Sequence, residues 1–187
     1  MSRSQPQHVV IVHLPAYAAV SPCPPPPPPV FDPPECPRVV NVSVAGSRMW
    51  PTCLGGNCAF WGVSKLVDGR ERSINSLGIT HWATNPYVQL DLGTLRRDIL
   101  TVRLVSRADT ALQQSQNLNV YLSATTDFLG ANSTLCEANV TFNGLGTEEI
   151  VLCPVNFNAR YVTVLKNGTN YLSLQEVQPM VDSKYPL

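Results

Sequence analysis

The stretch ARYVTVLKNGTNYLSLQEVQP, residues 159–179, contains two runs, ARYVTVLKNG and YLSLQEVQP, in which apolar and polar side chains alternate. Alternation of this kind is typical of a β-strand with one buried face. Similar runs, or runs rich in β-branched residues, precede them: YVQLDLG at 87–93, ILTVRLVSR at 99–107, LNVYLSA at 118–124 and EEIVLCP at 148–154. Because these runs show no helical periodicity, the sequence predicts an all-β fold, an antiparallel β-sandwich.

The core of this sandwich is predicted from the apolar members of the runs, since side chains two residues apart share one face of a strand. They are Val88, Leu90, Leu92, Val102, Leu104, Val120, Leu122, Val162, Val164, Leu172 and Leu174. We expect the sandwich to span residues 38–181, after a segment of residues 1–37 and before a tail of residues 182–187.

Charge and composition limit the partners. The 187 residues include 13 Lys and Arg and 13 Asp and Glu, so no excess charge favours nucleic acid or an anionic membrane. No apolar stretch reaches the length of a membrane span. Charged residues make up only 14% of the chain, so we expect glycans to supply solubility. Four N-x-S/T sequons, at Asn41, Asn132, Asn139 and Asn167, indicate a secreted, extracellular glycoprotein.

Six cysteines in a sequon-rich chain favour disulfides. Zinc is disfavoured because the chain has no CxxC pair and its histidines are scattered. Cys53 and Cys58 enclose LGGN, whose glycines allow a tight turn, so a local disulfide between them is predicted. Cys136 and Cys153 bracket a pattern typical of a β-hairpin, whose arms they would join. The remaining pair is Cys23 with Cys36.

The residues before Pro37 are expected to be extended, because SPCPPPPPPVFDPPECP, residues 21–37, lacks the backbone donors of a helix or central strand. We expect a polyproline II stalk. It resembles the hydroxyproline-rich segments of plant and algal extracellular glycoproteins, and an unmodified stiff linker is the alternative. Upstream, HVVIVHLPAYAAV, residues 8–20, has two interpretations. It is either a signal peptide or a strand that pairs with a sheet edge of this or a neighbouring molecule, giving self-association.

The order of the motifs resembles a known family. The motifs are NVSVAGS (41–47), KLVDGR (65–70), PYVQLDLG (86–93), TVRLVSRAD (101–109), NVYLSA (119–124) and ARYVTVLKNGTNYLSLQEVQ (159–178). They follow the order and spacing of the discoidin, or coagulation-factor C-type, domain, a galactose-binding-like jelly roll. Within that group the chain is most similar to the fucolectins, animal fucose-binding lectins with a structural calcium ion. The resemblance covers residues 41–180.

The resemblance implies a site for Ca²⁺. The side-chain ligands would be Asp68, in a VDG turn, and Glu176, in the last strand. A hydroxyl would come from Thr80, and backbone carbonyls from Lys65, Arg70 and Gln175. Such a set suits Ca²⁺, which takes about six to eight oxygen ligands. The family often has cysteine where this chain has Gln175, and a carbonyl ligand survives that change.

The resemblance also implies a sugar-binding pocket at one loop end of the sandwich. His81 matches the family's histidine, and Arg107 with Asp109 matches its R-x-D element, in which Asp109 would orient Arg107. Gln114 stands where the family has a second basic residue, so the pocket is either retuned to another sugar or lost. Trp82 would stack on a sugar ring or pack within its loop. Arg107 is expected at the pocket rim, with few core contacts.

Catalysis finds little support in the sequence. It contains no G-x-S-x-G, HExxH or phosphate-binding loop, and the adjacent Glu148 and Glu149 of a predicted strand would point to opposite faces. Two functions remain. One is an extracellular, calcium-dependent, lectin-like module on a proline-rich stalk, with glycans as partners. The other is a non-catalytic structural glycoprotein of an extracellular matrix, wall or surface filament, which the four sequons favour.

Overall fold

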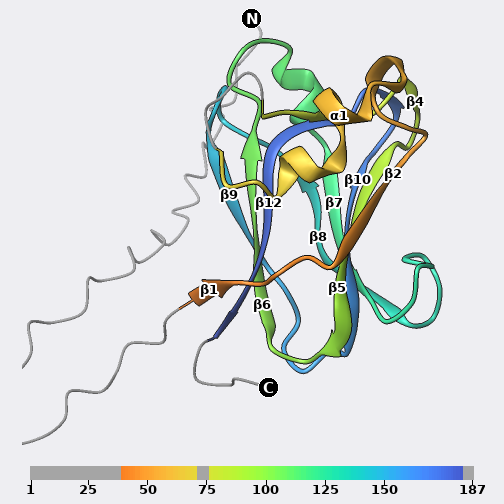
Figure 1. The fold of residues 1–187 in the computed structure, drawn as a ribbon. Helices are drawn as coiled ribbons and strands as arrows, with labels where there is room; N and C mark the ends of the chain where they lie inside the picture. The colour runs from red at the N-terminus through yellow and green to blue at the C-terminus, as the bar shows by residue number, and fades with distance from the viewer. Residues whose placement is uncertain (1–38, 71–75, 183–187) are drawn as a thin grey trace, which may run out of the picture. The chain divides into compact units, whose positions relative to one another are not determined.

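A computed structural model of the chain describes residues 39–70 and 76–182. All of these belong to the unit Pro37–Leu187, one of the two into which the chain divides. They form two antiparallel β-sheets that pack face to face (Figure 1). The predicted all-β sandwich is confirmed.

The first sheet has the order β1-β12-β6-β9, and β3 also pairs with β12. Its strands are β1 (Val39–Asn41), β12 (Ser173–Asp182), β6 (Ile99–Ser106), β9 (Glu148–Leu152) and β3 (Gly78–Ile79). The second sheet has the order β2-β5-β10-β7-β8. Its strands are β2 (Gly46–Trp50), β5 (Tyr87–Arg96), β10 (Ala159–Lys166), β7 (Leu118–Ser123) and β8 (Ser133–Val140). A small sheet pairs β4 (Ala83–Thr84) with β11 (Thr169–Asn170).

The chain passes from one sheet to the other at several connections, from β5 to β6, from β6 to β7 and from β8 to β10 through β9. This alternation gives the predicted jelly-roll arrangement. The six alternating or β-branched runs of the sequence all form strands, although the last begins at Ser173 rather than Tyr171.

The core lies between the two sheets. All eleven predicted core residues are buried, none more than 6% exposed. Burial of each Leu or Val side chain contributes roughly 1.5–3 kcal/mol, so this layer is the main stabilising feature of the sandwich. Leu66, Val140 and Phe142 extend it beyond the prediction.

A β-bulge in β12 changes which of its side chains face the core. Leu174 pairs with Ser106 but Glu176 pairs with Val105, so β12 has one extra residue at Gln175. Leu174 and Val177 both join the core cluster, although they are three residues apart. Strict alternation from Leu174 would have turned Glu176 into the core.

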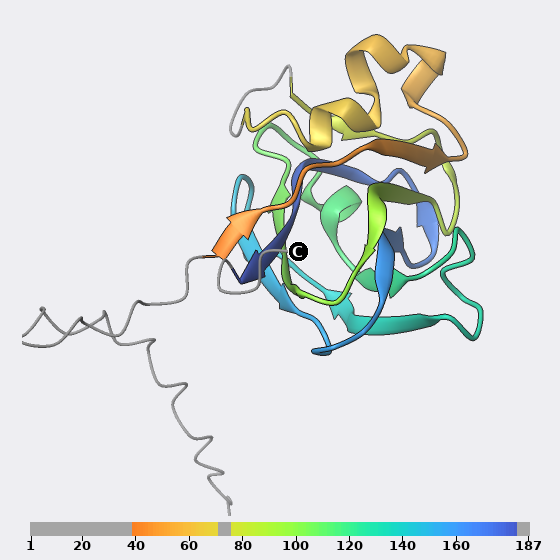
Figure 2. The same cartoon turned by 60° about the horizontal axis from the view of Figure 1, so that its bottom comes forward.

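The sequence pattern predicts no helices, but four short helical segments are present within the described residues. They are η1 (Leu54–Gly56), α1 (Cys58–Trp61) and η2 (Val63–Leu66) between β2 and β3, and η3 (Leu112–Ser115) between β6 and β7. Each has three or four residues, too few for a helical period to show in a window of about 11 residues. Figure 2 shows the first three as a gold segment beside β2.

The predicted disulfides Cys53–Cys58 and Cys136–Cys153 are confirmed. The hairpin predicted between Cys136 and Cys153 is wrong. Strand β8 pairs with β7, and β9 pairs with β6 in the other sheet. The second disulfide therefore joins Cys136 of the edge strand β8 to Cys153, which directly follows the edge strand β9 of the opposing sheet. The sequence pattern correctly predicted two strands with a turn between them. It did not predict which strands they pair with, because that depends on contacts with distant parts of the chain.

Several predictions fall outside the described residues: the polyproline II stalk, the signal or strand at residues 8–20, and the Cys23–Cys36 disulfide. The side chain of Asn41 is also outside them. Across residues 39–70 and 76–182, the helices are too short to cross a membrane.

Removing the inter-sheet disulfide should reduce stability. A Cys136→Ala/Cys153→Ala variant opens a loop with a sequence separation of 17, worth about 3 kcal/mol of unfolding free energy by loop-closure entropy. The control, Cys53→Ala/Cys58→Ala, opens a separation of only 5 and should lose about 2 kcal/mol. Denaturant unfolding followed by circular dichroism measures both. If the Cys136→Ala/Cys153→Ala variant were as stable as wild type, the inter-sheet disulfide would not stabilise the sandwich.

Candidate functional site

Oxygen atoms gather where the turn after η2 meets β12. The turn is closed by a hydrogen bond from Arg70 N to Asp68 Oδ1 at 2.9 Å. Gly69 has a φ of 68°, a conformation that glycine adopts at no steric cost. Its N–H donates to Glu176 Oε1 at 3.3 Å. The bulge in β12 thus brings Glu176, which is 1% exposed, to the turn that holds Asp68.

The hydroxyl at this cluster comes from Ser76. Ser76 Oγ lies 2.6 Å from both carboxylate oxygens of Asp68 and 3.5 Å from the carbonyl oxygen of Lys65. Thr80, which the sequence analysis selected, instead accepts a hydrogen bond from Leu172 N at 2.9 Å. The family spacing pointed to Thr80, and the only sequence signal for Ser76 was a hydroxyl residue in the same loop.

The oxygens of this cluster suit a hard cation such as Ca²⁺, which prefers carboxylate, hydroxyl and carbonyl ligands. No group of three or more His, Cys, Asp or Glu side chains that could hold a metal occurs within residues 39–70 and 76–182. The backbone carbonyl oxygens of Lys65, Arg70 and Gln175 are the further candidate ligands. A pocket of about 320 Å³ opens beside the cluster and is lined by Asp68, Gly69 and Glu176.

A second site surrounds Arg107, which directly follows β6. Its Nε and one terminal nitrogen donate to the two carboxylate oxygens of Asp109, each at 2.7 Å. Its other terminal nitrogen donates to Gln114 Oε1. The expected rim position is wrong, because Arg107 is only 7% exposed. The R-x-D spacing lets the carboxylate fold back onto the guanidinium, which fixes the arginine in place.

Hydrogen bonds of Lys166 and Ser115 anchor the loop that carries Gln114. Lys166 is 4% exposed, and its Nζ donates to the carbonyl oxygens of Gln113 and Gln116, each at 2.8 Å. Burial lowers the pKa of Lys166. Ser115 Oγ donates to Ser173 O at 2.6 Å, which ties the same loop to β12. These hydrogen bonds tie the loop to β10 and β12.

A pocket of about 290 Å³ lies at Arg107. One wall consists of Arg107, Gln114, Thr110 and Ala111, and the other of Leu54, Trp61, Ile79 and Tyr171. The sequence analysis missed the second wall, because the short helical segment and β3 that supply most of it carry no periodic signal. Tyr171, the first residue of the predicted run YLSLQEVQP, was the one residue of this wall that the sequence could have indicated.

His81 and Trp82 do not line this pocket. Both are exposed, and both contact Tyr171: the ring centroids are 5.3 Å apart for Trp82 and 6.4 Å apart for His81. Tyr171 thus links the predicted His81–Trp82 pair to the Arg107 pocket. The structure brings Arg107, Asp109 and Gln114 together directly. His81 and Trp82 reach the pocket only through Tyr171, which lines it.

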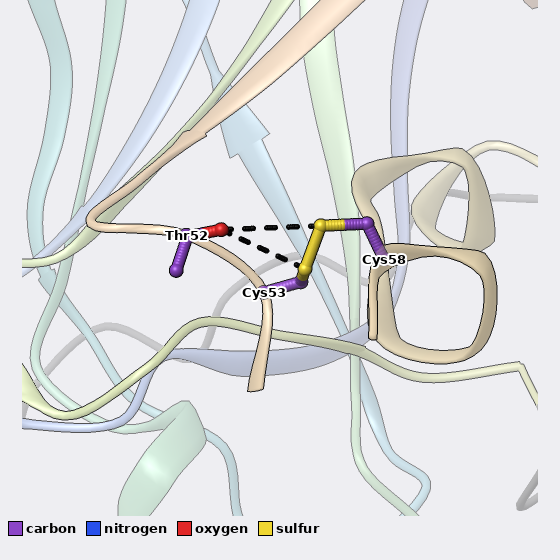
Figure 3. The surroundings of a disulfide bond; sticks show 3 residues. All are labelled: Thr52, Cys53 and Cys58. Carbon is purple, nitrogen blue, oxygen red and sulfur yellow. Dashed lines mark hydrogen bonds between the residues drawn. A yellow bond between two sulfur atoms is a disulfide. The ribbon is translucent and has the colours of Figure 1, made fainter. Parts of the chain in front are cut away.

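The Cys53–Cys58 disulfide supports the aromatic side of the site. Thr52 O accepts a hydrogen bond from His81 N at 2.6 Å. The Thr52 hydroxyl is directed at both sulfur atoms, at 3.7 and 3.9 Å (Figure 3). The disulfide closes the turn that begins the helical segment, and this segment supplies two residues of the pocket wall.

Two predicted glycosylation sites lie against each other. Asn167 Nδ2 donates to Asn139 Oδ1 at 3.2 Å and to Asn119 Oδ1 at 2.9 Å. Asn139 and the third described sequon residue, Asn132, are exposed, whereas Asn167 is half-buried. Glycans on Asn139 and Asn167 would leave the surface side by side.

Neither a known sequence family nor a curated protein matches the chain. Solved structures do match. A fucolectin from the serum of striped bass, Morone saxatilis, aligns with a TM-score of 0.63 and 20% identity over 73% of this chain and 46% of its own. The lectin domain of lectinolysin, solved with Lewis B antigen, gives 0.61 and 24% over 77% and 98%. A fucose-binding module of Streptococcus pneumoniae gives 0.58 and 20% over 76% and 96%. The chain has the galactose-binding-like discoidin fold that the motif order predicted.

Acid should weaken the Arg107–Asp109 pair. The hydrogen bond from Arg107 lowers the pKa of Asp109 from 3.8 to about 2. A lowered folded-state pKa means that the carboxylate stabilises the fold above pH 3.8 and that this stabilisation is lost as the pH falls toward 2. In urea unfolding, Asp109→Asn should therefore be less stable than wild type at pH 5, and the difference should shrink between about pH 4 and 2.

The exposed Asp127 provides the control for this pH series, because its carboxylate accepts a local hydrogen bond from Leu129 N. Asp127→Asn should show no comparable pH-dependent difference. A stability difference for Asp109→Asn that did not vary with pH would show that the charge of Asp109 does not hold Arg107.

Proposed function

We propose that the chain is an extracellular, non-catalytic carbohydrate-binding module that binds a sugar at the Arg107 pocket. The fixed guanidinium of Arg107 carries this proposal. Three of its five N–H groups bind Asp109 and Gln114, which leaves two to donate to sugar hydroxyls. The fold supports the proposal, since the bass protein is a lectin and the pneumococcal module binds fucose. The two disulfides within the described part of the chain support an oxidising, extracellular location.

The pocket suits a neutral sugar. Asp109 balances the charge of Arg107, so an ionised group on the sugar would gain little from the pair. Gln114 Oε1 is engaged by Arg107, which leaves the amide nitrogen of Gln114 as a further donor. Trp61 and Tyr171 line the other wall, where aromatic rings would contact the apolar C–H face of a sugar ring.

Pre-orientation favours binding because little side-chain freedom is lost when the sugar arrives. Lys166 and Ser115 hold the loop of Gln114, and Asp109 holds Arg107. With a neutral amide at position 114, we expect monosaccharide binding in the high micromolar to millimolar range, roughly −4 to −6 kcal/mol. Useful affinity would then need several copies of the module.

We also propose a structural Ca²⁺ at the cluster of Asp68, Ser76 and Glu176. The carboxylate and hydroxyl oxygens of these side chains are hard ligands of the kind that Ca²⁺ prefers. The cation would tie the Asp68 turn to β12, which stabilises the fold rather than takes part in chemistry.

A structural glycoprotein is the second candidate, and the contact between Asn139 and Asn167 favours it. Asn167 N donates to Asn117 O at 2.9 Å, close in sequence to the loop that forms the Arg107 pocket. If both sites carried glycans, the module would display its own carbohydrate on the surface of a wall or filament. A glycan array probed with and without Ca²⁺ separates the two candidates, because the structural role predicts no hits.

Replacing Arg107 should remove sugar binding. In Arg107→Gln the charge-assisted donors are lost, and the affinity for sugars identified on the array should fall by about 1.5–3 kcal/mol. Fluorescence of the pocket tryptophan Trp61 provides the titration signal. Because Arg107 is buried, this variant should also lose stability, so the control must share that defect.

Arg96→Gln is that control, since Arg96 makes an equivalent pair with Asp98 at 2.7 and 2.9 Å and does not line the pocket. It should lose stability and keep sugar binding. Equal affinity of wild type and Arg107→Gln would refute the proposed pocket.

Calcium removal should lower the melting temperature. A ligand at 100 times its Kd stabilises the folded state by about 2.7 kcal/mol, so EDTA should destabilise wild type measurably. Asp68→Ala should melt near the EDTA value and no longer respond to EDTA. Thr80→Val should keep the EDTA-induced fall in melting temperature, and Ser76→Ala should reduce it. The reason is that, of these two hydroxyls, that of Ser76 contacts Asp68 and that of Thr80 contacts Leu172. A melting temperature unaffected by EDTA would contradict the calcium site.

A further inference from the structure

A separate pocket lies on the outer face of the second sheet, on the side away from the core. Its volume is about 190 Å³ and its lining includes Gly46, Arg48, Gln89, Asp91 and Tyr161. Thr126, from the loop between β7 and β8 that is drawn in teal in Figure 1, completes it. The volume is below the roughly 300–1,000 Å³ of drug-sized sites, so the pocket would accommodate one small ring.

Strand register builds this pocket from two neighbouring rows. In one row Arg48 stands opposite Gln89, and Gln89 stands opposite Thr163. In the next row Gly46 stands opposite Asp91, and Asp91 opposite Tyr161. The rows are ~7 Å apart along the strands. Because Gly46 has no side chain, its position leaves the hollow beside Arg48 open.

Gln89 holds Arg48 in one orientation. Gln89 is 1% exposed, and its amide nitrogen donates to Thr163 Oγ1 at 2.8 Å and to Thr126 O at 3.3 Å. Its Oε1 accepts a hydrogen bond from Arg48 Nε at 2.8 Å. Arg48 also donates to Thr126 O at 2.9 Å through a terminal nitrogen. A buried glutamine with all these contacts is a rigid support for the guanidinium.

The partners of Arg48 are neutral, which distinguishes it from the paired arginines of the sandwich. Arg96, Arg103, Arg107 and Arg160 each form an ion pair with Asp or Glu. Within residues 39–70 and 76–182, Arg48 has no carboxylate partner. It therefore keeps its full positive charge at the pocket, with N–H groups left over in the planar fork that matches a carboxylate or sulfate.

The other end of the pocket suits a polyhydroxylated ring. Asp91 is bound by Arg160 at 2.8 and 2.9 Å, so its charge is balanced and its oxygens can still accept from hydroxyls. The guanidinium of Arg160 lies 5.3 Å from the ring centre of Tyr161, which fixes the aromatic wall. Arg48, Arg160 and Asp91 together carry a net charge of about +1.

We propose that this pocket binds an acidic sugar unit, a ring that carries a carboxylate or sulfate group. The oxyanion would accept hydrogen bonds from Arg48, the ring would contact Tyr161, and the ring hydroxyls would donate to Asp91. The site shares no residue with the Arg107 pocket and does not depend on it. It would let the module bind acidic glycans along the sheet face while the loop end binds a neutral sugar.

Two-dimensional NMR titration of the ¹⁵N-labelled protein tests this site through the Arg48 Nε–H and Gln89 amide signals. The probes are D-glucuronate, glucose 6-sulfate, neutral glucose and inorganic sulfate. We expect both acidic sugars to shift these signals and glucose to do so at least about tenfold more weakly, since one charge-assisted pair is lost. Which acidic sugar binds more tightly identifies the oxyanion.

Three variants locate the binding. Arg48→Gln and Gly46→Leu should each weaken acidic-sugar binding by about tenfold or more. Gly46→Leu should fold, because an added Cβ meets its nearest atom, Asp91 Cβ, at an ordinary 3.8 Å. Arg107→Gln should leave this binding unchanged, which separates the site from the proposed neutral-sugar pocket.

Three outcomes would overturn the proposal. They are acidic-sugar binding that persists in Arg48→Gln, equal binding of glucose and glucuronate, and inorganic sulfate binding as tightly as either sugar. The last would mean that Tyr161 and Asp91 contribute nothing and that the site holds a bare ion.

Discussion

Strand β12 is the constraint on which the rest of the molecule depends. It is paired with β1, β3 and β6 in the first sheet, and its apolar residues Leu174 and Val177 lie in the core. The backbone carbonyl of its Ser173 accepts a hydrogen bond from the Ser115 hydroxyl, in the loop of the Arg107 pocket. The carboxylate of its Glu176 accepts a hydrogen bond from the backbone amide of Gly69. Both candidate sites at this sheet are thus held by a strand that the hydrophobic core keeps fixed.

The bulge at Gln175 reconciles the core with the candidate cation site. Without it, period-two alternation would direct Glu176 inward beside Leu174, where an ionised carboxylate is costly. The extra residue turns the carboxylate to the Asp68 turn and returns Val177 to the core. One inserted residue therefore serves packing and ligand geometry together, a use for which bulges are known.

The two sugar pockets that we propose differ in whether their arginine is paired with a carboxylate. Arg107 is neutralised by Asp109 and so presents directional donors without net charge. Arg48 is oriented by Gln89 and Thr126 O, which are neutral, and so presents donors with charge. The same residue type is suited to a neutral hydroxyl in one place and to an oxyanion in the other, because the partner that orients it differs.

The sequence by itself determined the sandwich, its core and the local disulfide Cys53–Cys58, because alternation and short spacing are local properties of the chain. Through the order of the motifs, it also indicated the candidate calcium ligands Asp68 and Glu176 and the candidate sugar-binding pair Arg107 and Asp109. Only the tertiary structure decided that Ser76 rather than Thr80 meets Asp68, that Cys136 and Cys153 join two sheets, and that Tyr171 and Trp61 wall the Arg107 pocket. The Cys136–Cys153 bond and the pocket contacts join separate segments of the chain that strand pairing brings together. Ser76 lies eight residues from Asp68 in a loop without a periodic pattern, so its contact also depends on the folded structure.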